Sequence, residues 1–326
     1  MTDASWMQAA ANAAAEQEPC VSQAPEIAPG RVLHIDGDMI AYWAGGNDDT
    51  TIETSRNVAA NKIDTMREYA GAERVIVHLT AASSTKGDRF LISTVKPYQG
   101  QRKSGRKPKN WAYLREWLET YTGPAFRVKN WATREADDGL AFFAYYDGAE
   151  CVMCTKDKDM RMLPGLHMNW DTMALTFVPR GAYSVVAGGL QYGHKWFWLQ
   201  LLHGDTADNI PGLPYYVDEK GKDKQCGPAT AEKFLSGTTN NDEAFATVYT
   251  MYESYYGGDW AHRMMEQALL LWLRHDRDAD MRNIWSILPH TPPLSHALDL
   301  IRKRVKEKYD EAHRLTGQSP ARQDAL

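Results

Sequence analysis

Two aspartates, Asp157 and Asp159, follow the apolar run "ECVMCT" at a spacing of two residues. Asp is a poor strand former, and two like charges this close repel each other unless something positive lies between them. A solvated turn would tolerate the pair because water screens the charges. A shared divalent cation would also tolerate it, and the choice depends on the rest of the chain.

Three further groups of acids also stand beside apolar runs or at the starts of expected helices. Glu135, Asp137 and Asp138 stand together in "READDGLA", Asp205 and Asp208 in "GDTADNIPG", and Asp36 follows "RVLHI". Acids at a helix start also serve as caps, so each group alone leaves that alternative open. Together they are eight acids, a set that favours oxygen-ligated cations such as Mg²⁺ and is large enough for two ions about 4 Å apart.

The elements between these groups predict a shared location for the acids. Residues 32–35, 74–80, 126–131 and 150–155 are short apolar runs typical of buried strands, and they alternate with segments of helical character. This alternation predicts an α/β fold with a mostly parallel sheet covered by helices on both faces. Ligands bind such sheets outside the carboxyl ends of the strands, where Asp36 and the Asp157/Asp159 pair are expected.

Composition narrows the class of protein. The chain has 326 residues, of which 43% are hydrophobic and 24% charged, with a net charge of −5. It lacks an apolar stretch long enough for a membrane helix, and its N-terminal residues lack the basic start and apolar core of a signal peptide, so a cytoplasmic location and no membrane partner are expected. Among the cysteines, Cys151 and Cys154 form a C-x-x-C, but in a strand they point to opposite faces, which favours two core residues over a zinc or redox site.

Positive charge is concentrated in one segment. The stretch "KPYQGQRKSGRKPK", residues 96–109, contains six Lys or Arg and no acid. One basic segment beside separate acidic clusters is typical of a protein that holds a phosphate polymer against metal ions.

The order "IDGD … READD … TKDKD … GDTADNIPG … CGPATAEKFL" resembles the 5′-nuclease superfamily, which includes flap endonucleases, the 5′-nuclease domain of bacterial DNA polymerase I and phage 5′→3′ exonucleases. The resemblance covers about residues 32–236 and is greatest to the phage exonucleases. It implies a PIN-like, mostly parallel sheet flanked by helices, a helical arch at about 88–122, and a helix–hairpin–helix-type DNA-binding element at 196–236.

The resemblance also implies roles for individual residues. The first metal site would use Asp36, Glu135, Asp137, Asp138 and Asp157, and the second Asp159, Asp205 and Asp208. Catalytic cations would be Lys96, Arg102 and Lys103, and DNA contacts would come from Tyr98, Gln99, Arg106, Lys107, Gly227 and Thr230. The implied cofactors are two Mg²⁺ ions, for which Mn²⁺ substitutes, and K⁺ in the helix–hairpin–helix element.

Two positions depart from the family pattern. Thr80 and Ala81 stand where an acid usually follows the second strand, and Gln99 stands where a lysine usually follows the arch tyrosine. His34, separated from Asp36 by one residue, is expected to pack under the sheet, since two-metal cleavage needs no histidine base.

The resulting hypothesis is a monomeric, metal-dependent 5′→3′ exonuclease with flap endonuclease-like activity, acting in phage DNA replication on DNA with 5′ ends or flaps and on RNA–DNA hybrids. A non-catalytic DNA-junction-binding protein on the same fold and a PIN-type ribonuclease are the alternatives. The expected organisation is a flexible tail at 1–30, a nuclease domain at 31–190, a helical domain at 191–292, and a charged helix and tail at 293–326.

Overall fold

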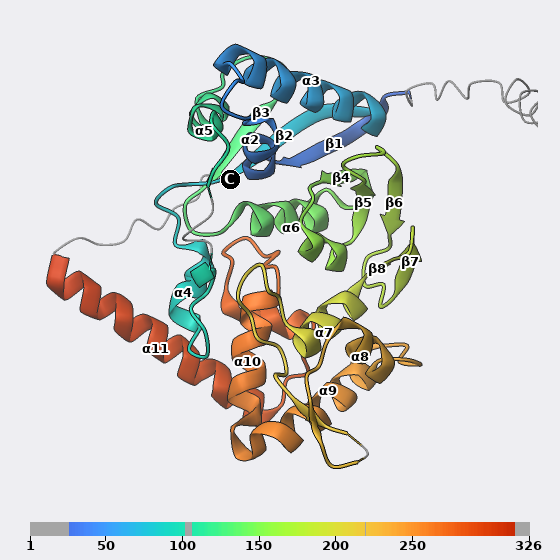
Figure 1. The fold of residues 1–326 in the computed structure, drawn as a ribbon, viewed down its shortest axis with the longest axis vertical. Coiled ribbons are helices and arrows are strands. Elements are labelled where there is room, and N and C mark those ends of the chain that lie inside the picture. Colours follow the sequence, from blue (N-terminus) through green and yellow to red (C-terminus); the bar gives the residue numbers. More distant parts are fainter. Residues whose placement is uncertain (1–25, 102–105, 219, 317–326) are drawn as a thin grey trace, which may run out of the picture.

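A six-stranded sheet forms the centre of the upper part of the molecule in Figure 1. The computed structural model describes residues 26–101, 106–218 and 220–316. The strand order is β3-β2-β1-β4-β5-β6, parallel except for β6. The strands are β1 (Ala28–Asp36), β2 (Ala72–Thr80), β3 (Arg127–Trp131), β4 (Cys151–Cys154), β5 (Gly165–Met168) and β6 (Leu175–Val178). The four strands predicted from the sequence are confirmed.

Helices cover both faces of the sheet. One face packs against apolar residues of α2 (Gly37–Ala44), α3 (Ile52–Ala70) and α5 (Trp111–Glu119). The other face packs against α6 (Ala136–Tyr146), which continues into the core of the helical region. Cys151 and Cys154 lie in these two different cores and are free thiols, as the strand alternation predicts.

The helical region lies below the sheet in Figure 1, on the far side of α6. It contains α7 (His194–His203), α8 (Pro228–Phe234), α9 (Asn241–Tyr256), α10 (Trp260–Leu271) and α11 (Pro292–Thr316). Hairpins β7 (Val185–Ala187) with β8 (Leu190–Tyr192), and β9 (Tyr216–Val217) with β10 (Asp223–Lys224), stand before α7 and α8. Helix α10 is buried along most of its length, and its buried residues include the polar Glu266 and Gln267 as well as its apolar side chains.

Short elements complete the chain. Helix α4 (Arg89–Ile92) and the 3₁₀ turns η1 (Lys86–Asp88), η3 (Gly148–Glu150), η4 (Lys158–Met162), η5 (Gly257–Asp259) and η6 (Met281–Ser286) connect the larger elements. In the segment expected to form the arch, the described residues contain α4, an irregular stretch and α5. None of the described helices combines the length and apolarity that crossing a membrane requires.

A buried chain of polar side chains joins the sheet to α6. Trp131 Nε1 donates to His78 Nδ1, His78 bonds to His34 at 3.0 Å, and His34 Nε2 lies 2.9 Å from Asp147 at the end of α6. Burial lowers the pKa of both histidines, so they are neutral. His34 is therefore a structural residue, as expected, and the chain helps to hold the helix that carries three of the predicted acids.

Candidate metal centre

Three carboxylates meet at the carboxyl edge of the sheet. Asp36 ends β1 and caps α2, accepting from the Met39 amide and from Thr155 Oγ1, both at 2.9 Å. Asp137 lies in the first turn of α6, and Asp157 follows β4. Parallel strands β1 and β4 are neighbours, so their ends bring Asp36 and Asp157 to one place, as the sequence predicts.

These carboxylates carry more negative charge than their surroundings balance. Burial, and then the charge of Asp38, raises the pKa of Asp36 to about 7. Burial and the charges of Asp157 and Asp36 raise the pKa of Asp137 well above its usual value, and burial also raises the pKa of Asp157. Asp137 makes no hydrogen bond or ion pair with any described residue. A buried cation would remove this penalty.

A second group lies beside the first. One carboxylate oxygen from each of Asp159, Asp205 and Asp208 lies within 4.8 Å of the others. Lys158 Nζ contacts two of these acids, at 3.2 Å from Asp159 and 2.5 Å from Asp205. Gln200 donates to Asp159 at 2.6 Å, and its own Oε1 is buried without a hydrogen-bond partner. An orphaned oxygen beside three carboxylates fits the donor set of a hard cation.

The motif "GDTADNIPG" forms a tight loop that presents Asp205 and Asp208. Asp205 and Ile210 exchange two backbone hydrogen bonds, of 2.8 and 2.7 Å. Gly204 and Gly212 both have positive φ, and a Cβ on Gly212 would lie 2.2 Å from the Gly204 nitrogen. Only glycine allows this approach, so the two glycines of the motif close the loop that carries the acids.

Two residues near the start of the basic segment, Tyr98 and Gln99, contact this loop. The Tyr98 hydroxyl lies 2.8 Å from Glu135 and 3.0 Å from Asp208, and the Gln99 amide donates to the same two acids at 3.2 and 3.1 Å. Tyr98 is only 4% exposed, so in this structure it links two acids and presents no ring to a base. Lys86 Nζ bonds to Gln99 Oε1 at 2.8 Å and lies 3.7 Å from Glu135.

Asp138 does not join the other acids. Its two oxygens accept from Arg89 Nη1 and Nη2 at 2.7 and 2.8 Å, and the Arg274 amide donates to it at 2.9 Å. Although burial opposes ionisation, Arg89 holds the pKa of Asp138 down at about 2. The metal role that the resemblance implies for Asp138 is therefore not supported by its surroundings, because a buried arginine already neutralises it.

The position that lacks the family acid is occupied differently. Asp38 pairs with Arg115 and accepts from the Thr80 amide at 3.1 Å, while Arg115 donates to the Thr80 carbonyl at 2.6 Å. The Thr80 hydroxyl accepts from the Ala136 amide at 2.9 Å and so satisfies the first amide of α6, whose N-cap is Glu135. Thr80 thus has a structural reason to be at the end of β2.

The other predicted residues have separate surroundings. Lys96 is exposed and bonds to no described residue; Arg102 and Lys103 lie outside the described residues. Arg106 pairs with Asp48 on the surface, and Lys107 Nζ lies 3.4 Å from the Trp111 ring centroid. Gly227 is the N-cap of α8, and Thr230 lies in that helix, half-buried.

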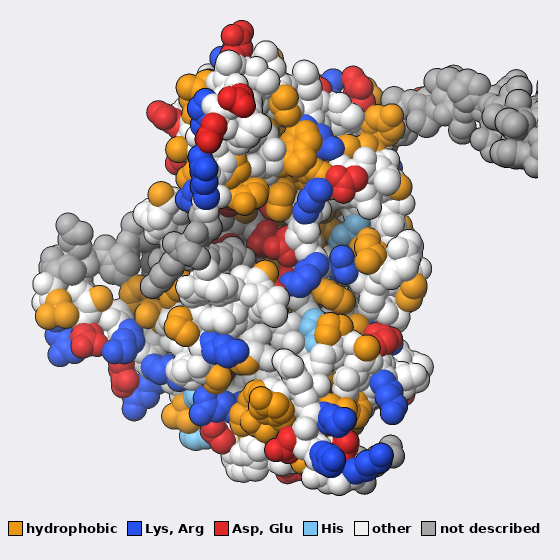
Figure 2. Space-filling view, viewed as in Figure 1, with side chains coloured by type: hydrophobic (Ala, Val, Ile, Leu, Met, Phe, Trp, Pro, Cys, Tyr) orange, Lys and Arg blue, Asp and Glu red, His pale blue; other side chains and the backbone are white. Residues whose placement is uncertain are grey.

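Sequence reasoning missed four residues of the centre: Lys86, Lys158, Arg89 and Gln200. Lys158 carried a signal, because it stands between Asp157 and Asp159. Arg89 and Lys86 lie about 50 residues before their acidic partners, and Gln200 is one polar residue in an apolar helix. Nothing in the local pattern pairs them with the acids. Figure 2 shows acidic side chains in a hollow at the middle of this face, between the sheet and the helical region.

No known protein-family profile matches the chain. A curated relative, DNA polymerase I of Bacillus caldotenax, is 26% identical over 194 residues, which are 56% of this chain but only 22% of that protein. The matched region therefore spans only about a fifth of the polymerase's own length.

Two solved structures share the fold. A T5 5′-exonuclease with bound divalent zinc ions aligns at a TM-score of 0.53 and 16% identity, covering 85% of this chain and 97% of that one. A complex of bacteriophage T5 flap endonuclease with DNA and metal ions aligns at a TM-score of 0.50 and 16% identity, covering 86% and 99%. These likenesses confirm the predicted α/β fold, while the helix–hairpin–helix detail stays a prediction.

Proposed function

We propose that this chain, which has the fold of the 5′-nuclease superfamily, is a divalent-metal-dependent 5′→3′ exonuclease with flap endonuclease-like activity on DNA. One observation carries the proposal: two adjoining groups of buried and half-buried carboxylates meet beside the sheet edge, and the Asp137 carboxylate among them has no described partner. The curated and structural relatives are a DNA polymerase I, a 5′-exonuclease and a flap endonuclease, two of them with metal ions, which supports the reaction class.

Two cations fit the oxygen donors. The first would be held by Asp36, Asp137 and Asp157, and the second by Asp159, Asp205 and Asp208 with Gln200 nearby. Mg²⁺ is the proposed ion because hard oxygen ligands suit it, and Mn²⁺ is its expected substitute. When bound, such ions supply a nucleophilic hydroxide at neutral pH and stabilise the leaving oxygen of a phosphodiester.

The chain's own residues position the substrate. Lys86 presents an ammonium beside Glu135, where Gln99 leaves no charge, and we assign it the phosphate-orienting role that a lysine after the tyrosine would have. Glu135 is fixed by Tyr98 and Gln99, so it orients the neighbouring acids and the loop at Asp208. Lys158 lies among the second group of acids and limits the repulsion there.

The remaining elements suit a DNA partner. Helices α7 and α8 with the β9–β10 hairpin would grip the duplex backbone, with K⁺ held by loop carbonyls, and the basic segment would contact a single-stranded 5′ end. A role in phage replication, action on RNA–DNA hybrids and a monomeric state belong to the same proposal. The departures at Thr80 and Gln99 favour the non-catalytic DNA-binding protein as the second candidate.

Cleavage of a 5′-labelled flap duplex tests the proposal. The assay compares Mg²⁺, Mn²⁺ and EDTA, with Asp157→Ala as the inactive variant. We expect metal-dependent release of the labelled 5′ fragment by the native chain alone. Tight DNA binding in Ca²⁺ without product in Mg²⁺ or Mn²⁺ would replace the nuclease by the DNA-binding protein, and cleavage of RNA but not DNA would favour the ribonuclease.

A further inference from the structure

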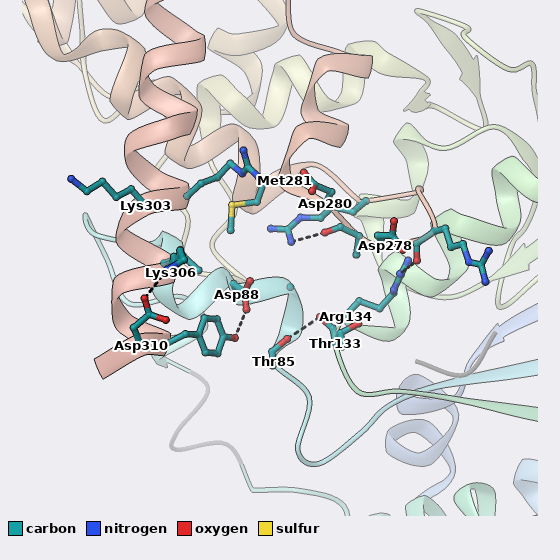
Figure 3. A pocket seen from close by; sticks show the side chains of 17 residues that line it. Thr85, Asp88, Thr133, Arg134, Asp278, Asp280, Met281, Lys303, Lys306 and Asp310 are labelled. Carbon is teal, nitrogen blue, oxygen red and sulfur yellow. Dashed lines mark hydrogen bonds and ion pairs between the residues drawn. The ribbon is translucent and has the colours of Figure 1, made fainter. Parts of the chain in front are cut away.

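A large cavity lies behind the metal centre. It has a volume of about 1030 Å³ and lies between the loop at residues 85–88, the segment 274–281 and one side of α11 (Figure 3). The loop joins the two sites: Gly87 lines the cavity, while its neighbour Lys86 bonds to Gln99 at the acids. No residue of the two acidic groups lines this cavity.

The charge of the lining favours an anion. Six cationic side chains line it against four aspartates; the cations are Arg134, Arg274, Arg277, Arg302, Lys303 and Lys306. Lys306 pairs with Asp310, and Asp88 accepts from the neutral Tyr309 hydroxyl and keeps its charge (Figure 3). Asp280 pairs with Arg282, which does not line the cavity. Lys303 lies 3.9 Å from Glu307, so the four arginines of the lining remain against Asp88 and Asp278, and positive charge is in excess.

Some guanidinium donors of Arg274 have no hydrogen-bond partner. It is only 3% exposed, and its Nη1 donates to the Ala279 carbonyl at 3.1 Å. Its Nε and Nη2 are buried without a hydrogen-bond partner. Leaving a charged donor buried and unpaired is costly, and two adjacent guanidinium nitrogens match two oxygens of a phosphate. Arg277 and Arg302, both exposed on the cavity lining, also bond to no described residue through their side chains.

The cavity has room for a ligand larger than a small ion. Its volume is at the upper end of the range of pockets that hold whole organic ligands, about 300–1,000 Å³. Met281, Val305 and Tyr309 add apolar surface to the lining. A nucleotide, with a charged phosphate joined to a sugar and an aromatic base, matches both the cationic and the apolar side chains of the lining.

We propose that this cavity binds the 5′-phosphate of a nucleotide, either free or at the end of a short oligonucleotide, with Arg274 as the buried phosphate ligand and Arg277 and Arg302 as outer cations. The site goes beyond the proposed nuclease centre and needs no metal. Because the Arg274 amide also bonds to Asp138, the same segment contacts both the cavity and the helix that carries the acids.

Isothermal titration calorimetry in EDTA tests the site, since removing divalent cations leaves the acidic centre repulsive to phosphates. The probes are a deoxynucleoside 5′-monophosphate, a 5′-phosphorylated tetranucleotide, the same tetranucleotide without its phosphate, and inorganic phosphate. We expect one equivalent of either phosphorylated nucleotide to bind, at least about tenfold more tightly than the other two probes. The first two probes distinguish a free nucleotide from a strand end.

Variants locate the binding. Arg274→Gln and the exposed Arg302→Ala should each weaken it by about tenfold or more, whereas Arg56→Ala, an exposed arginine on α3, should leave it unchanged. Arg302→Ala keeps the test valid if Arg274→Gln fails to fold. No binding in EDTA, equal binding of inorganic phosphate, or binding unaffected by Arg302→Ala would overturn the proposal. Flap cleavage in Mg²⁺ is measured separately, so its failure is distinguishable from failure of this site.

Discussion

Asp137 and Asp138 are neighbours on the first turn of α6, yet they have opposite electrostatic environments. Burial and nearby acids raise the pKa of Asp137, whereas Arg89 lowers the pKa of Asp138 to about 2 although Asp138 is fully buried. Helical geometry explains the split, because consecutive residues point about 100° apart. One faces the acids of the sheet edge, and the other faces α4 and the segment after α10.

The difference separates structural from functional acids. A buried carboxylate that an arginine neutralises holds the fold together, and breaking the pair leaves a buried charge. A buried carboxylate without a cation destabilises the protein by itself and is kept for a ligand. By this criterion we propose a functional role for Asp36, Asp137 and Asp157, whereas Asp138 and Asp38 are each held in an ion pair with an arginine.

The largest expected effect comes from removing the unpaired acid. Asp137→Ala should lower the cleavage rate by about 10⁴-fold, because effects of this size follow loss of a central catalytic group. Its thermal stability in EDTA should not fall, since the lost carboxylate had no described partner. The cleavage rate and the melting temperature of Asp137→Ala are measured together. A variant that loses stability but keeps its activity would show that Asp137 holds the fold and does not act in cleavage.

Arg89→Met should cause the largest loss of stability. The variant leaves Asp138 buried and unpaired, which costs about 3–5 kcal/mol in the free energy of unfolding. Urea unfolding measures it against Arg106→Met, which removes an ion pair whose side chains are 82% and 72% exposed and should cost under about 1 kcal/mol. Equal costs in the two variants would show that the buried pair is not special.

The two kinds of acid should give opposite pH dependence in EDTA. Asp36 has a folded pKa of about 7, above its unfolded 3.8, so its contribution to stability is fully present below pH 3.8 and is lost as pH rises through 7. Asp138 has a folded pKa of about 2, so its contribution is present above pH 3.8 and is lost as pH falls through 2.

The variants Asp36→Asn and Asp138→Asn therefore distinguish the contributions of these two acids to stability. At pH 8 in EDTA, Asp36→Asn should be more stable than the native chain by on the order of a few kcal/mol, and Asp138→Asn less stable. Adding Mg²⁺ should raise the melting temperature of the native chain more than that of Asp36→Asn. A native melting temperature that Mg²⁺ leaves unchanged would argue against a metal site here.

The smallest expected effect concerns the cation at the edge of the centre. Lys86→Met should lower the cleavage rate by about tenfold, which is about 1.4 kcal/mol, and Lys86→Arg should restore part of it. Lys96→Met tests the alternative that the resemblance implies, because Lys96 lies in the basic segment, is exposed and bonds to no described residue. A larger loss in Lys96→Met than in Lys86→Met would move the phosphate-orienting role to Lys96.

Much of this arrangement follows from local sequence. The apolar strands, the acids at their carboxyl ends and the glycines of "GDTADNIPG" are read within a few residues of one another, because alternation, capping and positive φ are local properties. The short strands β5 and β6 were not predicted, since each has four residues and, unlike the equally short but wholly apolar β4, interrupts its apolar residues with Gly, His or Thr.

Only the tertiary structure decided which acid meets which cation. The sequence places Asp137 and Asp138 side by side with nothing to separate them, and their difference depends on Arg89, 49 residues earlier than Asp138. Lys86 beside Gln99, and Arg274 in the cavity behind, likewise depend on loops packed together from distant parts of the chain. Residue types and spacing determine which groups are available for chemistry, whereas long-range packing determines which of them are neutralised, because charges interact through space and not along the chain.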